Sequence, residues 1–142
     1  MAQNKTFLIG LTVVAAVVTF LLSRVIWPDL AGMPMPVGAQ LPLLILVSAL
    51  ESIAFGVGLA FLVSLWPTMK GRGAWDWLTL LSATWLLVSW WPHDNLHRTT
   101  MMGDYWRLIG IEWAFHVTLI LAGVIVASYI WKGFAMSGQK KS

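Results

Sequence analysis

The sequence predicts an all-helical membrane protein, a bundle of four transmembrane helices joined by short loops. Three observations predict this fold class: an apolar composition, four long apolar stretches, and tryptophans at the ends of those stretches. Hydrophobic residues make up 58% of the 142 residues, charged residues make up 11%, and the mean hydropathy is +0.77. Soluble domains hold about 45–50% apolar and about 25% charged residues. A soluble fold of this size could not hide so much apolar surface from water.

Each apolar stretch approaches or exceeds the length of about 20 residues that crosses a bilayer as a helix. Helices are expected because lipid cannot satisfy the open edge of a strand. The first stretch is longer than the apolar core of a signal peptide and lacks a small-residue cleavage site, so we expect it to be retained. A single domain, residues 1–142, would thus contain helices over residues 6–27, 41–66, 75–91 and 105–131.

Aromatic residues and prolines mark the expected helix ends. An indole ring favours the membrane interface, where its N–H can face water. Prolines 28, 67 and 92 stand where the chain would leave a helix and the missing N–H is tolerated. Eight of the ten tryptophans fall near an expected boundary: Trp27, Trp66, Trp75, Trp77, Trp90, Trp91, Trp106 and Trp131.

Basic residues predict the orientation, because they are enriched in cytoplasmic loops. One side of the membrane would carry Asp76 and six basic residues, a net charge of +5. The other side would carry three arginines and three aspartates, a net charge of zero. Both termini are therefore expected in the cytoplasm, and the bacterial cytoplasmic membrane is the expected location. The six basic residues are Lys5, Lys70, Arg72, Lys132, Lys140 and Lys141.

Composition also excludes several kinds of function. The chain has no cysteine, which excludes disulfides, thiolate metal sites, iron–sulfur clusters and thiol catalysis. No motif matches a phosphate-binding loop, a zincin or a nucleophile elbow, so the sequence does not assign an enzyme reaction. The basic residues are scattered at helix ends, so nucleic acid is not an expected partner. The expected partners are the lipid bilayer and either further copies of the chain or a larger membrane complex.

Three ionisable residues fall inside the expected helices, where a charged carboxylate costs at least about 2.5–3.5 kcal/mol. Glu51 and His116 each lie about ten residues into a helix, or about 15 Å below the outer surface. Glu112 precedes His116 by four residues, so the two side chains share a helix face. Groups of this kind are functional by default in membrane proteins.

A polar segment stands above these residues and carries His93, Asp94 and His97. We expect it to belong to an outer loop over residues 92–104. In depth order, His93 and His97 would lie at the mouth, then Glu112, then His116 with Glu51 opposite. Imidazole and carboxylate groups suit zinc, copper, iron or nickel. The sequence therefore predicts a metal site whose candidate ligands are His93, His97, Glu112 and His116, with Asp94 and Glu51 as supporting carboxylates.

Copper is the favoured metal, because four of the seven methionines fall in the expected outer loops and thioethers select Cu(I). Zinc and iron are alternatives. Haem is less favoured, because two axial histidines at matched depths are usual and His116 alone lies clearly inside a helix. The four methionines are Met33, Met35, Met101 and Met102.

Other interpretations of the same residues stay open. The carboxylates and imidazoles are also consistent with hydrogen-bonded core groups without a ligand. Two further functions compete with metal binding: an accessory subunit of a respiratory, photosynthetic or oxygenase complex, and a proton or ion conduit. Small residues around Gly56 and Gly123 allow close helix contact, either inside the bundle or with a partner.

Overall fold

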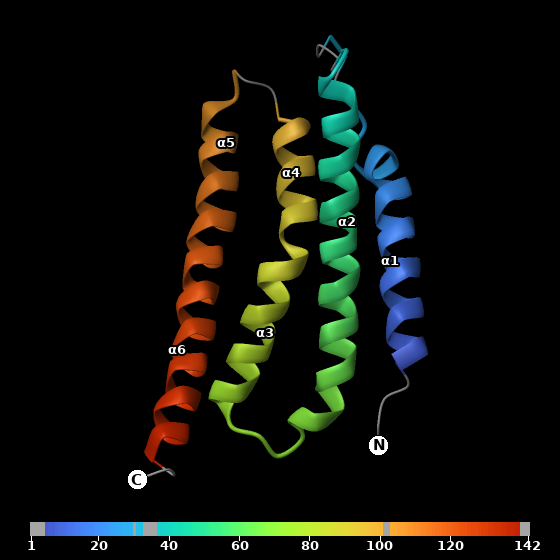
Figure 1. Cartoon of the computed structure of the whole chain (residues 1–142). Helices are drawn as coiled ribbons and strands as arrows, with labels where there is room; N and C mark the ends of the chain where they lie inside the picture. Colours follow the sequence, from blue (N-terminus) through green and yellow to red (C-terminus); the bar gives the residue numbers. More distant parts are fainter. Residues whose placement is uncertain (1–4, 30, 33–36, 101–102, 140–142) are drawn as a thin grey trace.

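A computed structural model describes residues 5–29, 31–32, 37–100 and 103–139, with side chains described as far as Lys132. It confirms the all-helical fold class, since the described residues form helices and no strand. Two short segments join the longer helices: a 3₁₀ helix η1 (Trp66–Met69) and a π-helix η2 (Trp113–Val117). The α-helices are α1 (Lys5–Ile26), α2 (Gln40–Leu65), α3 (Ala74–Val88), α4 (Trp90–Arg98), α5 (Tyr105–Glu112) and α6 (Thr118–Gln139) (Figure 1).

Three helical segments are long and apolar enough to cross a membrane: Lys5–Ile26, Gln40–Met69 and Tyr105–Lys132. The third expected span is shorter, because α3 has 15 residues. At 1.5 Å per residue it extends about 22 Å, less than the roughly 30 Å of a hydrocarbon core. A fourth crossing therefore remains a prediction.

The sequence had suggested that the chain leaves its helix at Pro92, but the structure shows otherwise. A break at Ser89 ends α3, and α4 starts directly afterwards. Pro92 lies in the first turn of α4, where the backbone N–H of an ordinary residue would have no helical partner, so proline is tolerated. The expected outer loop over residues 92–104 is consequently much shorter, because helix continues to Arg98.

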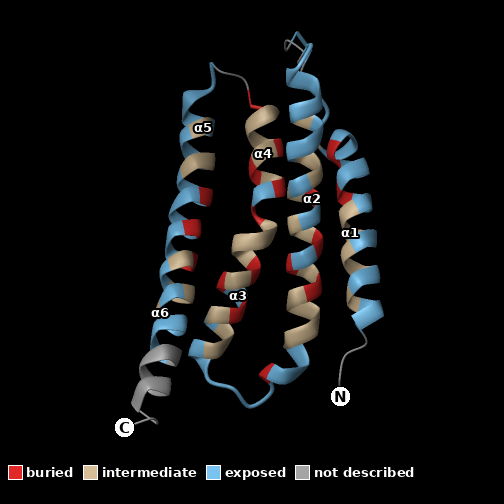
Figure 2. Ribbon diagram, viewed as in Figure 1, coloured by how far each residue is buried: buried red, intermediate tan, exposed pale blue. Residues whose placement is uncertain are grey.

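The helices pack side by side in a row. Helix α1 packs on α2, α2 packs on α3 and α4, and α6 packs on α3. The start of α1 and the last turns of α6 lie at one end of the molecule (Figure 1). Figure 2 shows that the buried residues gather on the helix faces within the row, while α1 and α5–α6 carry long exposed stretches. Those exposed stretches are rich in valine, leucine and isoleucine, as expected of a surface that faces lipid.

Two glycines allow the closest approach of these helices. A Cβ atom on Gly56 would collide with the carbonyl oxygen of Thr12 in α1. On Gly58 it would stand 2.9 Å from the Cβ atom of Leu87 in α3. Small residues are used in this way where helices associate in lipid, because the backbones can then pack together. The close packing fixes α1 and α3 on either side of α2.

Candidate metal centre

Helix α4 presents two of the chain's three histidines on one face. His93 and His97 are four residues apart, a spacing that stacks side chains on a helix. Their Nε2 atoms lie 2.9 Å apart, and their ring centroids are separated by 4.5 Å. One of the two nitrogens therefore donates a hydrogen bond to the other. The pair forms one wall of the candidate site.

The opposite wall comes from the junction of α5 and η2. Glu112 is the last residue of α5, and His116 lies in the π-helix that follows. A π-helix bonds residue i to i+5, so its turn is wider than that of an α-helix, and such segments are frequent at functional sites. The Nδ1 atom of His116 contacts Oε2 of Glu112. The shared face that the sequence predicted for these two residues is confirmed.

Side-chain contacts with α3 hold the π-helix in place. The indole N–H of Trp85 donates to the hydroxyl of Thr118 over 2.9 Å, and its ring stacks on Phe115 at 5.7 Å. The Thr118 hydroxyl itself donates to the carbonyl oxygen of Ala114 over 2.6 Å. No local sequence pattern predicts this support, because it joins residues 33 positions apart.

The two walls meet and bring all three histidines to Glu112. The Nε2 atom of His97 lies 2.9 Å from Oε1 of Glu112. The rings of His93 and His116 are 4.9 Å apart at an angle of 78°. Ligand atoms of His93, Glu112 and His116 all lie within 4.8 Å of one another. Zinc binds imidazole nitrogen and carboxylate oxygen at about 2.0–2.2 Å, so small side-chain rotations would let these three atoms reach one ion.

The cluster is closed on one side and open on the other. His93 is buried and packs against Phe115, whose ring centroid is 4.9 Å away. The side chain of His116 is 51% exposed and that of Glu112 is 41% exposed. A shallow pocket of about 220 Å³ lies beside them, lined by Glu112, Trp113, His116 and Val117. A bound ion would therefore be reachable from one direction and could keep a position for a further ligand.

Burial and charge act on His93, which lies in α4, outside the three helical segments that are long and apolar enough to cross a membrane. Burial lowers the pKa of His93, and the imidazoles of His97 and His116 lower it further. The carboxylates of Glu112 and Asp94 act in the opposite direction with smaller effect. A histidine whose pKa is lowered stays neutral at neutral pH, and the neutral imidazole is the form that binds a metal.

The structure corrects the depth order expected from sequence. His93 contacts His116 directly, so the histidines form one compact cluster instead of a ladder. The reason is that α4 is a helix lying beside α5 and η2, where a polar outer loop had been expected. The expected supporting carboxylates, Asp94 and Glu51, are not members of the triad found among the described residues. The methionines that favoured copper, Met33, Met35, Met101 and Met102, lie outside the described residues.

Comparison with protein-family models, with curated proteins and with solved structures finds no match to this chain.

Proposed function

We propose that this chain is a multi-pass membrane protein that binds one transition-metal ion through His93, Glu112 and His116. The observation that carries the proposal is the meeting of every histidine of the chain with Glu112, from two separate helical segments. Polar groups on an otherwise apolar chain are costly to bury, and membrane proteins keep them chiefly where they act on ions or substrates.

The chemistry of the three ligand atoms limits which metal ions the site would bind. Two imidazoles and one carboxylate suit Zn²⁺ and Fe²⁺, and imidazole also suits copper. The preference for copper rests on methionines outside the described residues and stays a prediction. Haem is not favoured, because the His93 and His116 rings lie 4.9 Å apart and leave no room for a porphyrin between two axial ligands.

His97 has a different proposed role from the three ligands. Its Nε2 atom lies 2.9 Å from both His93 and Glu112. Partners that hydrogen-bond to metal ligands orient them, and losing such a partner typically lowers metal affinity about 10–100-fold. We assign His97 to orienting Glu112 toward the ion.

Elemental analysis of gently purified protein tests this proposal. Wild-type protein prepared without chelator should retain close to one equivalent of metal per chain. His93→Gln and His116→Gln should lose it, because each removes one ligand nitrogen. His97→Gln should retain metal with an affinity lower by about 10–100-fold, as expected of an orienting group.

A control is available on the same helical segment. Asp104 caps the start of α5 by accepting a hydrogen bond from the backbone N–H of Arg107 over 3.2 Å. Asparagine caps helices equally well, so Asp104→Asn removes a carboxylate charge without unfolding the turn. This variant should bind metal as the wild type does. Metal-free wild-type protein that also fails to take up added Zn²⁺, Fe²⁺ or Cu²⁺ would contradict the proposal.

The proposed topology has four crossings, with residues 75–91 as the third and both termini in the cytoplasm. The excess of basic residues on one side supports it. The chain lacks cysteine, so single cysteines can report on each side. Gly73 and Gly103 both have open space around a Cβ atom and suit this substitution. A membrane-impermeant thiol reagent applied outside intact cells should label Gly103→Cys and spare Gly73→Cys; the reverse pattern would overturn the orientation.

A second candidate function is that of a subunit in a larger membrane complex. Large aromatic side chains are exposed along the segment from α5 to α6: Trp106 by 85%, Trp113 by 68% and Trp131 by 76%. Aromatic side chains are enriched both at membrane interfaces and in protein–protein contacts. Extraction in a mild detergent tests this function, since a solitary species would count against a stable complex. Metal binding and membership of a complex are compatible.

A further inference from the structure

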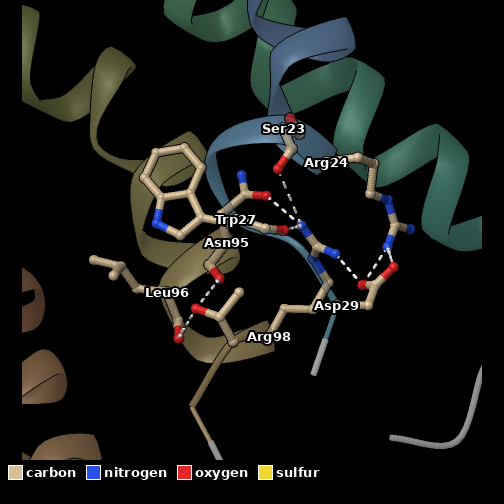
Figure 3. A network of polar contacts seen from close by, with 8 residues as sticks. Ser23, Arg24, Trp27, Asp29, Asn95, Leu96 and Arg98 are labelled. Atoms are coloured by element: carbon tan, nitrogen blue, oxygen red, sulfur yellow. Dashed lines mark hydrogen bonds and ion pairs between the residues drawn. The ribbon is translucent and has the colours of Figure 1, made fainter. Parts of the chain in front are cut away.

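Helix α4 has two faces, and the face away from the histidines is held by a polar network. Trp91, Asn95 and Arg98 recur at the spacing of one helix face, roughly opposite His93 and His97. This second face meets the end of α1 and the segment that follows it (Figure 3).

Trp91 anchors the first turn of α4. Its indole N–H donates to the hydroxyl of Ser23 in α1 over 2.9 Å. Its ring packs edge-on against Trp27 at 4.9 Å, and it packs at a tilt of 59° against Phe55 of α2 at 5.1 Å. Both Trp91 and Ser23 are buried. The start of α4 is therefore fixed against α1 and α2.

Arg98 anchors the last turn. One guanidinium nitrogen, Nη1, pairs with the carboxylate of Asp29. The other, Nη2, donates to the carbonyl oxygen of Trp27 over 3.0 Å and to Oδ1 of Asn95 over 2.9 Å. The amide nitrogen of Asn95 donates in turn to the carbonyl oxygen of Trp91 over 2.6 Å. Figure 3 shows the Arg98 guanidinium between these acceptors.

A helix of nine residues depends on such contacts, since isolated helices below about 12 residues are marginal. The contacts of Trp91 and Arg98 with α1 and the segment that follows it help to fix the rotation of α4 about its own axis. That rotation decides where His93 and His97 point, and metal ligands must be held within about 0.5 Å of their productive positions. The geometry points to Arg98 as a positioning residue of the metal centre, acting through α4 on His93 and His97. This inference rests on the proposed metal binding.

Arginine is suited to this position for a geometric reason. Its planar fork reaches a carboxylate with one nitrogen and two neutral acceptors with the other, whereas lysine offers one point charge. The side chain of Arg98 is 18% exposed, so its contacts are partly shielded from water. Arg24 provides a matched comparison. It pairs with the same carboxylate of Asp29, but it belongs to α1, and its side chain is 44% exposed.

The test is Co²⁺ binding by purified full-length protein, followed by the visible absorption of the bound ion. Arg98→Gln should weaken Co²⁺ binding by about 10–100-fold and alter the spectrum of the bound ion, because the imidazoles are displaced. Arg24→Gln should change the affinity by less than about fivefold, as for an exposed ion pair, and leave the spectrum unaltered. Arg98→Lys keeps the charge and most of the volume, and should still weaken binding and alter the spectrum.

The outcomes distinguish the positioning role of Arg98 from the existence of the metal centre. An Arg98→Gln protein with wild-type affinity and spectrum would overturn the positioning role. Equal losses in Arg98→Gln and Arg24→Gln would overturn it as well, since the effect would then belong to the Asp29 ion pairs in general. If Arg98→Gln does not purify as a folded protein, Arg98→Lys decides by the same two readouts. Wild-type protein that fails to bind Co²⁺, Zn²⁺, Fe²⁺ or Cu²⁺ would overturn the metal centre itself.

Discussion

The two ends of the molecule differ in how their side chains are held. The histidine end, formed by α4 and the junction of α5 with η2, is held by ion pairs and hydrogen bonds between polar groups. The hairpin end, formed by η1, residues 70–73 and the start of α3, is held by aromatic packing. There Trp66 and Trp77 pack edge-on at 4.7 Å, and Lys132 lies 4.6 Å from the ring centre of Trp75.

The difference indicates where the chain places its chemistry. A pocket of about 250 Å³ at the hairpin end is lined by both apolar and polar residues, with Arg72 and Asp76 among them. Tryptophans and a basic residue at this level are typical anchors at the membrane interface. The histidine end instead gathers groups that bind protons or metals. The proposed metal binding and the expected membrane anchoring would thus lie at opposite ends of the same helices.

The largest effect on metal affinity should come from neutralising Glu112, the carboxylate at the histidine end. Glu112→Gln should lower metal affinity by at least about 100-fold, because it removes a ligand that two histidines also contact. Asp76→Asn, a matching change at the hairpin end, should leave metal affinity unaltered. Competition titration with a chromogenic chelator measures both variants. Equal losses in the two would contradict the separation of the ends.

One part of the histidine end could be predicted from periodicity alone. The spacing of Glu112 and His116 predicts a shared face, and the contact between their side chains follows from it. The contact of His93 with His116 could not be predicted, because it depends on α4 being helical and on the side on which it packs. The link between Arg98 and Asp29 spans 69 positions and leaves no local pattern.

A substitution midway between the two ends should lower the stability of the protein and leave its metal affinity unaltered. Gly56→Ala would place a Cβ atom against the Thr12 carbonyl oxygen, and overpacking of this kind costs about 1–3 kcal/mol. We expect a lower melting temperature in detergent, measured by circular dichroism, with metal affinity per folded molecule unaltered. Gly10→Ala is the control, because open space surrounds a Cβ atom there. Equal melting temperatures for the two variants would show that the α1–α2 contact is not tight.

The dependence of stability on pH should also arise at the histidine end. The pKa of His93 is lowered in the folded protein, so the unfolded chain binds a proton more readily. The contribution of His93 to the free energy of unfolding is therefore constant above the ordinary histidine pKa of about 6.5. Below that value metal-free protein should lose stability, until the pH passes the lowered folded pKa. His93→Gln should reduce this loss in thermal melts between pH 7.5 and 5. An identical pH profile for the variant would contradict the assignment.

The smallest effect is expected from the cation–π contact at the hairpin end. Lys132→Gln removes the charge above the Trp75 ring, a contact worth about 0.5–1 kcal/mol at an exposed site. Chemical denaturation should detect a small loss of stability, and metal binding should be unaltered. A change in metal affinity would indicate coupling between the ends.

The fold class follows from composition, since hydropathy alone predicts apolar helices. The helix boundaries are less predictable. Residues 75–91 have the composition of a span, yet the helix breaks at Ser89 and resumes as α4. The π-helix at Trp113–Val117 could not be predicted either, because the contact of its Phe115 with Trp85 of α3 supports it. In both places the local pattern is helical, and packing against neighbouring helices decides how the helix is interrupted.

X-ray absorption at the edge of the metal that the protein retains tests the central claim most directly. The proposed metal centre predicts nitrogen and oxygen ligands at about 2.0–2.2 Å, the distances expected for a zinc ion. It also predicts the multiple scattering of at least two imidazoles, reduced in His116→Gln. A shell of oxygen alone, or an imidazole signal that persists unaltered in His93→Gln and His116→Gln, would contradict it.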